Sequence, residues 1–280
     1  MERTTELTLW IRRPQVLLQK MLVYIIVIFG AVIFAMPFVW MVRTSVMPAA
    51  QVWKYPPEWI PDRIVLDNFK MEGTPFARWF LNSFVLAWLS IVRAVLASSL
   101  VAFGFARIRF PGKEVLFILL LSSMMLPGQV TLIPTYLLFN RLNLLDTYAP
   151  LILRASLADP FHVFLLRQFF MTIPSELDDA ARIDGCGLFG LFWRIVLPQA
   201  IPALGVLCIY EFSFMWNNFY LPLIYIDSID KFPVALGLQL LVGQYRTDMG
   251  AMMAAALMAV MPIITIFYFL QRRLVAGIVI

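Results

Sequence analysis

The sequence predicts an all-α integral membrane protein with six transmembrane helices. Three observations point to this class: the chain is 61% hydrophobic, only 14% of its 280 residues are charged, and the apolar residues gather in six long runs. A soluble domain carries about 25% charged residues, which help to cover its surface. Because the mean hydropathy is +0.83, we expect the chain to cross a membrane several times.

Each apolar run is long enough for a transmembrane helix, which needs about 20 mostly apolar residues. No small-residue cleavage site follows the first run, so we expect it to be retained rather than removed as a signal peptide. The sequence shows no internal repeat, and the runs are expected to form one six-span membrane domain over 21–271. The predicted spans are 21–42, 80–106, 114–138, 149–170, 200–226 and 250–271.

Basic residues predict the orientation of the chain. Lys and Arg gather on the cytoplasmic side of membrane proteins, and several precede the first span. We therefore expect the N-terminus, 1–20, in the cytoplasm, and six spans return the short C-terminus, 272–280, to the same side. The basic residues before the first span are Arg3, Arg12, Arg13 and Lys20.

The polar segment 171–199 interrupts the apolar pattern, with ELDDAARIDG at 176–185. Ser175 and Asp178 fit a capping box at the start of a helix, and Asp178 stands four residues before Arg182, a spacing at which the two can pair. Gly185 is placed to end that helix.

A second, apolar stretch follows the glycine and ends at Pro198. The segment is therefore predicted as a helix, a glycine turn and a second helix that protrude from the membrane. Apolar side chains outside a membrane need cover. Two alternatives provide it: packing on the protein's own spans, or docking of a partner.

The spacing within this segment resembles a known motif. Asp179-Ala180-Ala181, Gly185 and Ile195-x-Leu197-Pro198 resemble the EAA motif of ABC-importer permeases, although Asp179 stands where the motif has glutamate. Further stretches resemble the smaller six-span subunit of carbohydrate importers of the maltose kind. They are RFPGK (109–113), MMLPGQVTLIP (124–134), FLLRQFF (164–170), WNNFYLPLI (216–224) and QRRLVAGI (271–278).

This resemblance implies the type I ABC importer permease fold, in which the 171–199 loop is a coupling helix that docks on a cytoplasmic ATPase. It also implies the partners: a second homologous permease, two ABC ATPase subunits, an extracytoplasmic solute-binding protein and the lipid bilayer of a prokaryotic cell (inner) membrane. ATP and Mg belong to the ATPase subunits. The residues implied in coupling are Asp179, Ala180, Ala181, Arg182, Asp184, Gly185, Leu188, Phe189 and Pro198.

The residues independently argue against a nucleotide site in this chain. A P-loop requires GxxxxGK followed by Ser or Thr. The one Gly-Lys pair, Gly112-Lys113, is followed by Glu114, and Arg107 stands where the first glycine belongs. We therefore expect no catalytic residue, no cofactor and no ATP hydrolysis in this chain.

Ionisable residues within predicted spans are candidates for function, because a charge in the bilayer is costly. Arg93, Arg154, Asp159 and Glu211 lie in such positions. One interpretation is a set of ion pairs between spans. The other is that Arg93 or Arg154 faces the pathway and selects an anionic substrate, such as glycerol phosphate or a uronate oligosaccharide. Pro160, directly after Asp159, is expected to kink the fourth span.

Sugar recognition needs aromatic faces and groups that hydrogen-bond hydroxyls. The fifth span offers several of these groups, and two more open the second span, although helix–helix hydrogen bonding is the competing explanation for the amides and hydroxyls. The complete set of substrate-pathway candidates is Asn82, Ser83, Arg93, Arg154, Glu211, Trp216, Asn217, Asn218 and Tyr220.

The predicted function is the permease subunit of an ATP-driven importer of a sugar or sugar derivative. The alternatives are the same importer type with an anionic substrate, or a stand-alone channel or secondary transporter. A channel needs no docking helix, and secondary transporters often contain inverted repeats. A membrane enzyme is disfavoured because the single histidine, His162, cannot build a metal site alone, and nothing indicates a nucleic-acid partner.

Overall fold

The computed structural model describes residues 14–153, 157–244 and 248–278, and every regular element in these ranges is a helix. The chain divides into two compact units. One comprises residues 1–71 with 245–257, and the other comprises 72–244 with 258–280.

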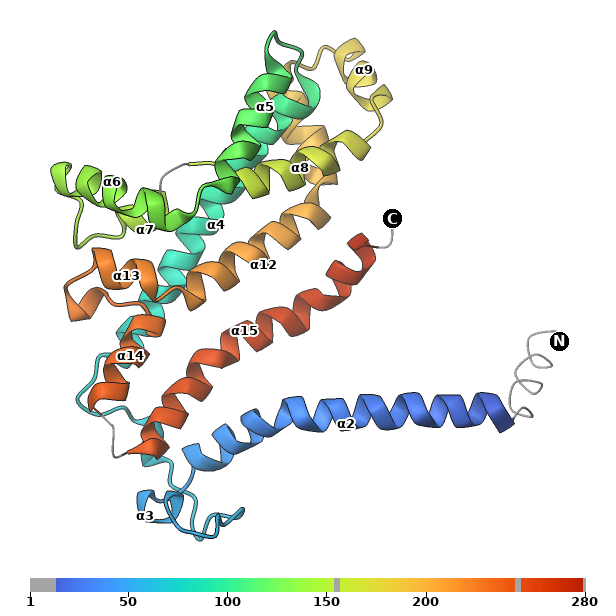
Figure 1. Ribbon diagram of the computed structural model, residues 1–280. Coiled ribbons are helices and arrows are strands. Elements are labelled where there is room, and N and C mark those ends of the chain that lie inside the picture. The colour runs from blue at the N-terminus through green and yellow to red at the C-terminus, as the bar shows by residue number, and fades with distance from the viewer. Residues whose placement is uncertain (1–13, 154–156, 245–247, 279–280) are drawn as a thin grey trace. The chain divides into compact units, whose positions relative to one another are not determined.

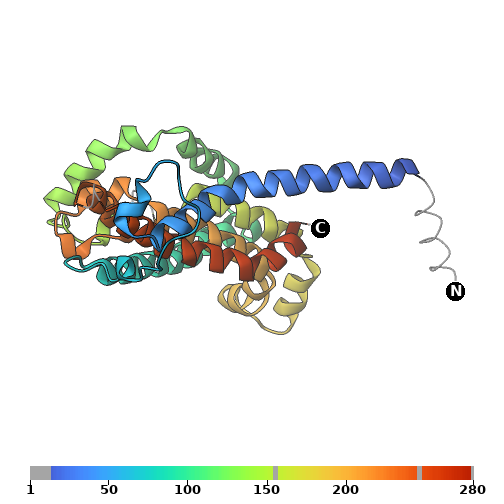
Figure 2. The same ribbon diagram turned by 90° about the horizontal axis from the view of Figure 1, so that it is seen from below.

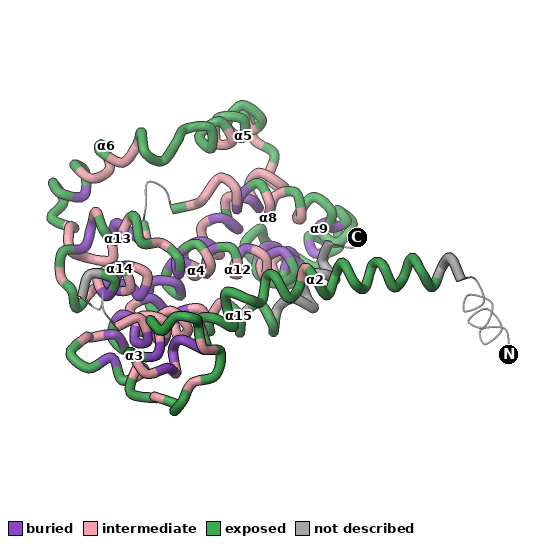
Figure 3. The backbone as a smooth tube through the Cα atoms, turned by 60° about the horizontal axis from the view of Figure 1, so that its bottom comes forward, coloured by how far each residue is buried: buried purple, intermediate pink, exposed green. Residues whose placement is uncertain are grey.

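The first unit is dominated by α2 (Pro14–Ser45), whose apolar side chains are exposed along almost its whole described length, as the green tube in Figure 3 shows. Such a helix has no core-facing side, which is typical of a lipid-facing or partner-facing span. It contains the predicted first span, 21–42.

The 46–70 segment after α2 is ordered by polar contacts rather than by long helices. It holds α3 (Ala49–Val52) and η1 (Asp67–Phe69). Arg43 Nε donates to the Glu58 carbonyl at 2.8 Å and its guanidinium lies over the Trp40 ring at 4.4 Å. Gln51 accepts from the Asp62 N–H at 3.0 Å. These contacts hold the proline-rich 53–61 stretch against α3 and the end of α2.

The core of the second unit forms where α4 (Phe76–Arg107), α8 (Pro160–Thr172) and α12 (Ile201–Asn217) pack together (Figure 1). Small residues on α4, Ala94 and Ala102, are fully buried and let the backbones approach closely. The larger buried side chains around them include Phe103, Val163, Leu166, Phe170, Phe192 and Leu207.

The predicted third span, 114–138, is two helices rather than one. α5 (Lys113–Ser122) continues through η2 (Ser123–Met125), and α6 (Gly128–Arg141) begins after Pro127. The two parts are bent by 97°, and Figure 2 shows them diverging. The residue before a proline avoids the helical region, and Leu126 accordingly has extended dihedral angles.

The predicted fourth span, 149–170, is also divided, into α7 (Ala149–Leu153) and α8. The expected kink at Pro160 is wrong: Pro160 is the first residue of α8, and the Asp159 carboxylate caps it by accepting from the Phe161 N–H at 2.9 Å. Proline favours this position because the N–H it lacks has no partner within the helix there.

The predicted fifth span, 200–226, is not one continuous helix. α12 stops at Asn217, and α13 (Tyr220–Tyr225) starts after the Asn218 side chain accepts from the Leu221 N–H at 3.1 Å. After α13 follow η4 (Ile229–Lys231), α14 (Val234–Gln244) and α15 (Met249–Ile278).

Three predicted spans, 21–42, 80–106 and 250–271, coincide with the single long helices α2, α4 and α15. The described residues provide three helices long and apolar enough to cross a membrane, or up to five candidates when each bent pair counts as one. The second bent pair joins 188–199 to α12 at 77°.

Candidate functional site

The 171–199 segment folds as the helix, turn and helix that its sequence predicts. α9 (Glu176–Ile183) is followed by Gly185, whose φ of +77° reverses the chain. The Cys186 N–H donates to the Ala181 carbonyl at 2.8 Å, which satisfies a carbonyl at the helix end. The second helix runs through α10 (Leu188–Gly190), the π-helix η3 (Leu191–Val196) and α11 (Leu197–Gln199).

The predicted capping box is wrong. Ser175 already has helical dihedral angles, φ −69° and ψ −20°, and its side chain makes no cap hydrogen bond, whereas a capping serine needs an extended backbone. Asp178 does not pair with Arg182 either. Its carboxylate lies 3.4 Å from Arg107 Nη1, with both side chains about 90% buried. Arg107 also donates to the Ile173 carbonyl at 2.7 Å, so α9 is tied to the end of α4.

The segment has a buried side and an exposed side. Ala181, Leu191 and Phe192 are buried in the core of the second unit. Of the predicted coupling residues, Ala181 is therefore in the core, and the others lie on the surface. The exposed residues of this set are Asp179, Ala180, Arg182, Asp184, Gly185, Leu188, Phe189 and Pro198.

Large apolar side chains lie on the exposed side. Ile183 is 87% exposed and Phe189 is 73% exposed, and Leu177 and Leu188 are also exposed. We call these four residues the exposed apolar face. An apolar face of this kind beside charged residues is typical of a protein interaction site. Packing on the protein's own spans therefore accounts for the buried side, and docking of a partner stays a prediction for the exposed side.

The Arg93 and Glu211 side chains form a buried ion pair between α4 and α12. Arg93 Nη2 lies 2.9 Å from Glu211 Oε1, and Nη1 donates to the Leu157 carbonyl at 2.7 Å. Ser90 Oγ donates to the same carboxylate. His162 on α8 places Nε2 3.9 Å from Glu211 Oε2. This cluster matches the interpretation in which ion pairs connect the spans; Ser90 and His162 are members that the sequence did not reveal.

Asn82 and Ser83 hold the segment between α13 and α14. Asn82 Nδ2 donates to the carbonyls of Asp230 and Phe232 at 2.8 and 3.0 Å, and Ser83 Oγ accepts from the Val234 N–H at 2.8 Å. Trp79, which sequence reasoning missed, is fully buried and donates to the Ile229 carbonyl at 2.8 Å.

Asp146 fastens the same segment from its other side. Its carboxylate accepts from the Asp227 N–H at 3.1 Å, from the Ser228 N–H at 2.9 Å and hydroxyl at 2.6 Å, and from Lys231 Nζ at 2.6 Å. The Lys231 ammonium, followed by the Ser228 donors, holds the pKa of Asp146 well below its ordinary value. Sequence reasoning missed this residue because its partners follow more than eighty positions later.

The candidates at the end of α12 serve different contacts. Trp216 is buried, donates to the Ala259 carbonyl at 2.9 Å and stacks on Phe212 with ring centroids 5.3 Å apart. Asn217 donates to the carbonyl of its own helix at Ser213. Tyr220 is about half exposed. Arg154 lies outside the described residues, and the other candidates form separate groups rather than one lined site.

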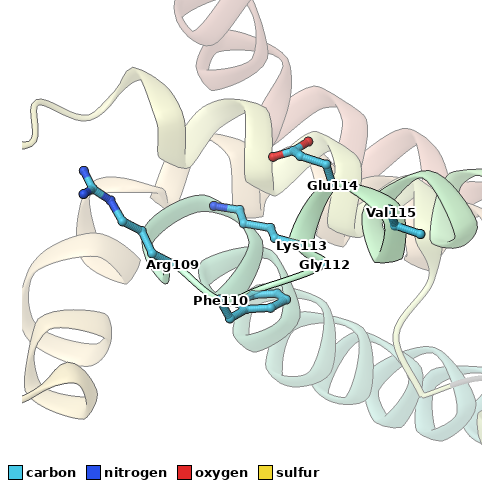
Figure 4. Close-up of a pocket in the computed structure, with 6 residues that line it drawn as sticks. All are labelled: Arg109, Phe110, Gly112, Lys113, Glu114 and Val115. Carbon is cyan, nitrogen blue, oxygen red and sulfur yellow. The ribbon is translucent and has the colours of Figure 1, made fainter.

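Two adjoining cavities lie where α4 ends. One, of about 590 Å³, is bounded by the 106–109 stretch and by α9. The other, of about 370 Å³, is bounded by Arg109, Phe110 and the first residues of α5 (Figure 4). Arg109 and Lys113 line both.

The match to known proteins decides the family. A family model described as the binding-protein-dependent transport system inner membrane component matches residues 94–280. The chain belongs to this family. It is a multi-pass permease subunit of an ABC transporter in the inner membrane, and subunits of this family lack a catalytic site of their own.

Two of the relatives are named for the substrates that their transport systems carry. The permease is 38% identical over 223 residues to the arabinooligosaccharides transport system permease protein AraQ of Halalkalibacterium halodurans, with 78% of each chain covered. It is 32% identical over 266 residues to the sn-glycerol-3-phosphate transport system permease protein UgpE of Yersinia pestis, with 91% of the permease and 94% of the relative covered.

A solved structure supports the fold. The permease matches a chain from the crystal structure of a bacterial ABC transporter involved in the import of the acidic polysaccharide alginate, with a TM-score of 0.83, 93% of the permease and 98% of that chain covered, and 18% identity. At this identity the match concerns the fold alone.

Proposed function

We propose that the permease imports a sugar or sugar derivative, and that its 171–199 segment transmits movement from a cytoplasmic ATPase to the membrane helices. The observation that carries this proposal is the two-sided geometry of the segment. Ile183 and Phe189 are exposed for docking, while Ala181 and Phe192 are buried among the spans. A partner that displaces the exposed side therefore moves the core.

The contacts at the base of α9 support this route. The Arg107–Asp178 pair joins α9 to α4, and the Arg107–Ile173 hydrogen bond joins the stretch just before α9 to α4. α4 in turn contacts α8 and α12. A rigid connection is required because packed elements transmit a displacement, whereas a loose loop absorbs it.

The proposed assembly follows from the resemblance and the family. It comprises this permease, a second homologous permease, two ATPase subunits that hold ATP and Mg, and an extracytoplasmic binding protein. We propose six crossings, with α5–α6 and α7–α8 each forming one broken span and both termini in the cytoplasm. Non-helical backbone at membrane depth is tolerated where protein or a water-filled cavity surrounds it.

The substrate class rests on the relatives. AraQ is named for arabinooligosaccharides, which supports a sugar oligomer as the substrate. A second candidate is an anionic substrate, supported by the glycerol-3-phosphate permease UgpE. The Arg93 charge is balanced by Glu211, so Arg93 gives the anionic candidate no additional support.

The test is co-purification from native membranes in mild detergent, with each subunit identified by mass. We expect an ATPase and a second permease to accompany the wild type. Phe189→Ala should weaken ATPase retention about tenfold, because a buried aromatic side chain contributes on the order of 1–3 kcal/mol to an interface. The control is Leu81→Ala, which truncates another large apolar side chain that is 64% exposed and lies near the start of α4.

Purification of a stable permease without an ATPase would contradict the coupling proposal and favour a stand-alone channel or secondary transporter. If Phe189→Ala retained the ATPase as well as the wild type does, the exposed apolar face would not be part of the ATPase interface.

A further inference from the structure

The two cavities at the end of α4 are rich in positive charge. The larger contains Arg107, Arg109, Lys113 and Arg182 together with Asp178 and Asp179. Arg107 and Asp178 neutralise each other as an ion pair. The remaining side chains of the larger cavity then carry three positive charges against the one negative charge of Asp179.

Arg109 and Lys113 connect the two cavities. Arg109 is exposed, and Lys113 is half-buried with Nζ 3.2 Å from the Ile108 carbonyl. Figure 4 shows both cationic groups extending to the same side of the turn, with Val115 pointing away from them. Glu114 also lines the smaller cavity, so the two cationic groups exceed its single negative charge.

An exposed apolar surface begins directly beside this charge. On α5 the side chains that follow Lys113 and Glu114 are large, apolar and at least half exposed: Val115, Leu116, Ile118 and Leu119. α4 is a candidate span that ends at Arg107, and α5 opens the next candidate. The turn 108–112 therefore follows the end of a candidate membrane-crossing helix, and headgroups meet acyl chains at the end of such a helix.

We propose that this turn is a binding site for an anionic membrane lipid. The lipid phosphate lies between Arg109 and Lys113, and the acyl chains lie along the exposed side of α5. A guanidinium binds two phosphate oxygens at once, and an ammonium adds a compact charge. Basic pockets between membrane helices are suited to such headgroups. The adjoining apolar surface favours a lipid over a free phosphate ion, because a free phosphate has no apolar part to cover that surface.

The position of the site places a bound lipid beside α9. The larger cavity is shared with α9 through Asp179 and Arg182, so a bound headgroup lies against the proposed coupling helix. The site does not depend on which ATPase or substrate the permease uses, and its test needs neither.

The experiment is native mass spectrometry of the full permease released from nanodiscs that contain phosphatidylglycerol and phosphatidylcholine in equal amounts. We expect retained phosphatidylglycerol on the wild type. Arg109→Gln with Lys113→Gln should lower its affinity about twenty-five-fold, because each basic residue at an anionic membrane surface contributes roughly fivefold. Arg109→Lys with Lys113→Arg keeps both charges and should retain the lipid.

Arg194→Gln is the control, because Arg194 is an exposed basic residue of η3 that lines neither cavity. Loss of lipid in this variant equal to that in the double glutamine variant would overturn the proposal, as would unchanged lipid in the double glutamine variant. Displacement of phosphatidylglycerol by added inorganic phosphate would assign the site to a free anion and overturn the lipid.

Discussion

Glu211 is fully buried on α12, and its charge is balanced by Arg93 and hydrogen-bonded by Ser90. A buried ion pair adds little net stability, but removal of one partner leaves an uncompensated charge. Asp146 is the opposite case, because its side chain is 29% exposed and is held by several donors at once. Solvent weakens each of these contacts, so the hydrogen bonds that Asp146 accepts contribute more through their number and geometry than through its charge.

Glu211→Gln is expected to destabilise the permease by about 3 kcal/mol, because it leaves the Arg93 charge buried without its partner. Arg93→Gln with Glu211→Gln should recover most of this loss. Thermal unfolding of the purified chain in detergent measures both. If the double variant lost as much stability as the two single variants together, the two side chains would not act as an ion pair. Selective loss of anionic substrates in Arg93→Gln, with neutral uptake kept, would assign Arg93 to substrate selection.

Asp146→Asn is expected to loosen the 227–231 segment at neutral pH. The folded pKa of Asp146 lies below its ordinary value of about 3.9, so its contribution is fully present above about pH 4 and is lost as the pH falls towards the folded pKa. Amide exchange at 227 and 228 should rise about tenfold in the variant at pH 7. Asp67→Asn, whose carboxylate also pairs with a lysine, should leave these amides unchanged.

At the scale of elements, the helix breaks decide how the apolar sequence is used. Pro127 and Asn218 divide two predicted spans into α5 and α6 and into α12 and α13, and Pro160 starts α8 within the predicted fourth span. Gly185 separates the two helices of the 171–199 segment in the same way. A Cβ at Gly185 would meet no atom within 4 Å, so only its positive φ restricts the choice of residue.

Gly185→Val is therefore expected to cost about 1–2 kcal/mol through backbone strain alone and to misdirect the second helix. Asn tolerates this conformation, so Gly185→Asn should keep most of the activity. The measurement is ATP-driven uptake by the whole importer, with membrane insertion checked in parallel. Normal uptake by Gly185→Val would show that the turn is not needed for coupling.

At the scale of the whole molecule, membrane orientation determines which surface meets the ATPase. With a cytoplasmic N-terminus and six spans, the 53–61 stretch after the first span is predicted outside, and the 176–185 stretch after the fourth span is predicted in the cytoplasm. Two free cysteines, Cys186 and Cys208, are present in the described residues, and both are removable for a labelling experiment.

In a Cys186→Ser and Cys208→Ser background, Glu176→Cys is expected to react with a membrane-impermeant thiol reagent only from the cytoplasmic side. Tyr55→Cys, at a residue that is 91% exposed, should react only from outside. Sealed right-side-out and inverted vesicles separate the two faces. Labelling of both positions from one face would contradict an odd number of crossings between them.

Local sequence was enough to predict the membrane class, the long helices α2, α4 and α15, and the turn at Gly185. These features follow from local properties, namely run length, composition and the freedom of glycine at positive φ. The motif spacing around Asp179 also sufficed for the family, which the match over 94–280 confirms.

Only the tertiary structure decided the pairing of side chains. Glu211 lies 118 positions from Arg93, and Lys231 lies 85 positions from Asp146. Neither pair can therefore be predicted from local sequence. The same holds for Asp178, which binds Arg107 of another helix instead of Arg182 four residues away. Packing of α4, α8 and α12 brings distant groups together, and a buried charge takes the partner that this packing supplies.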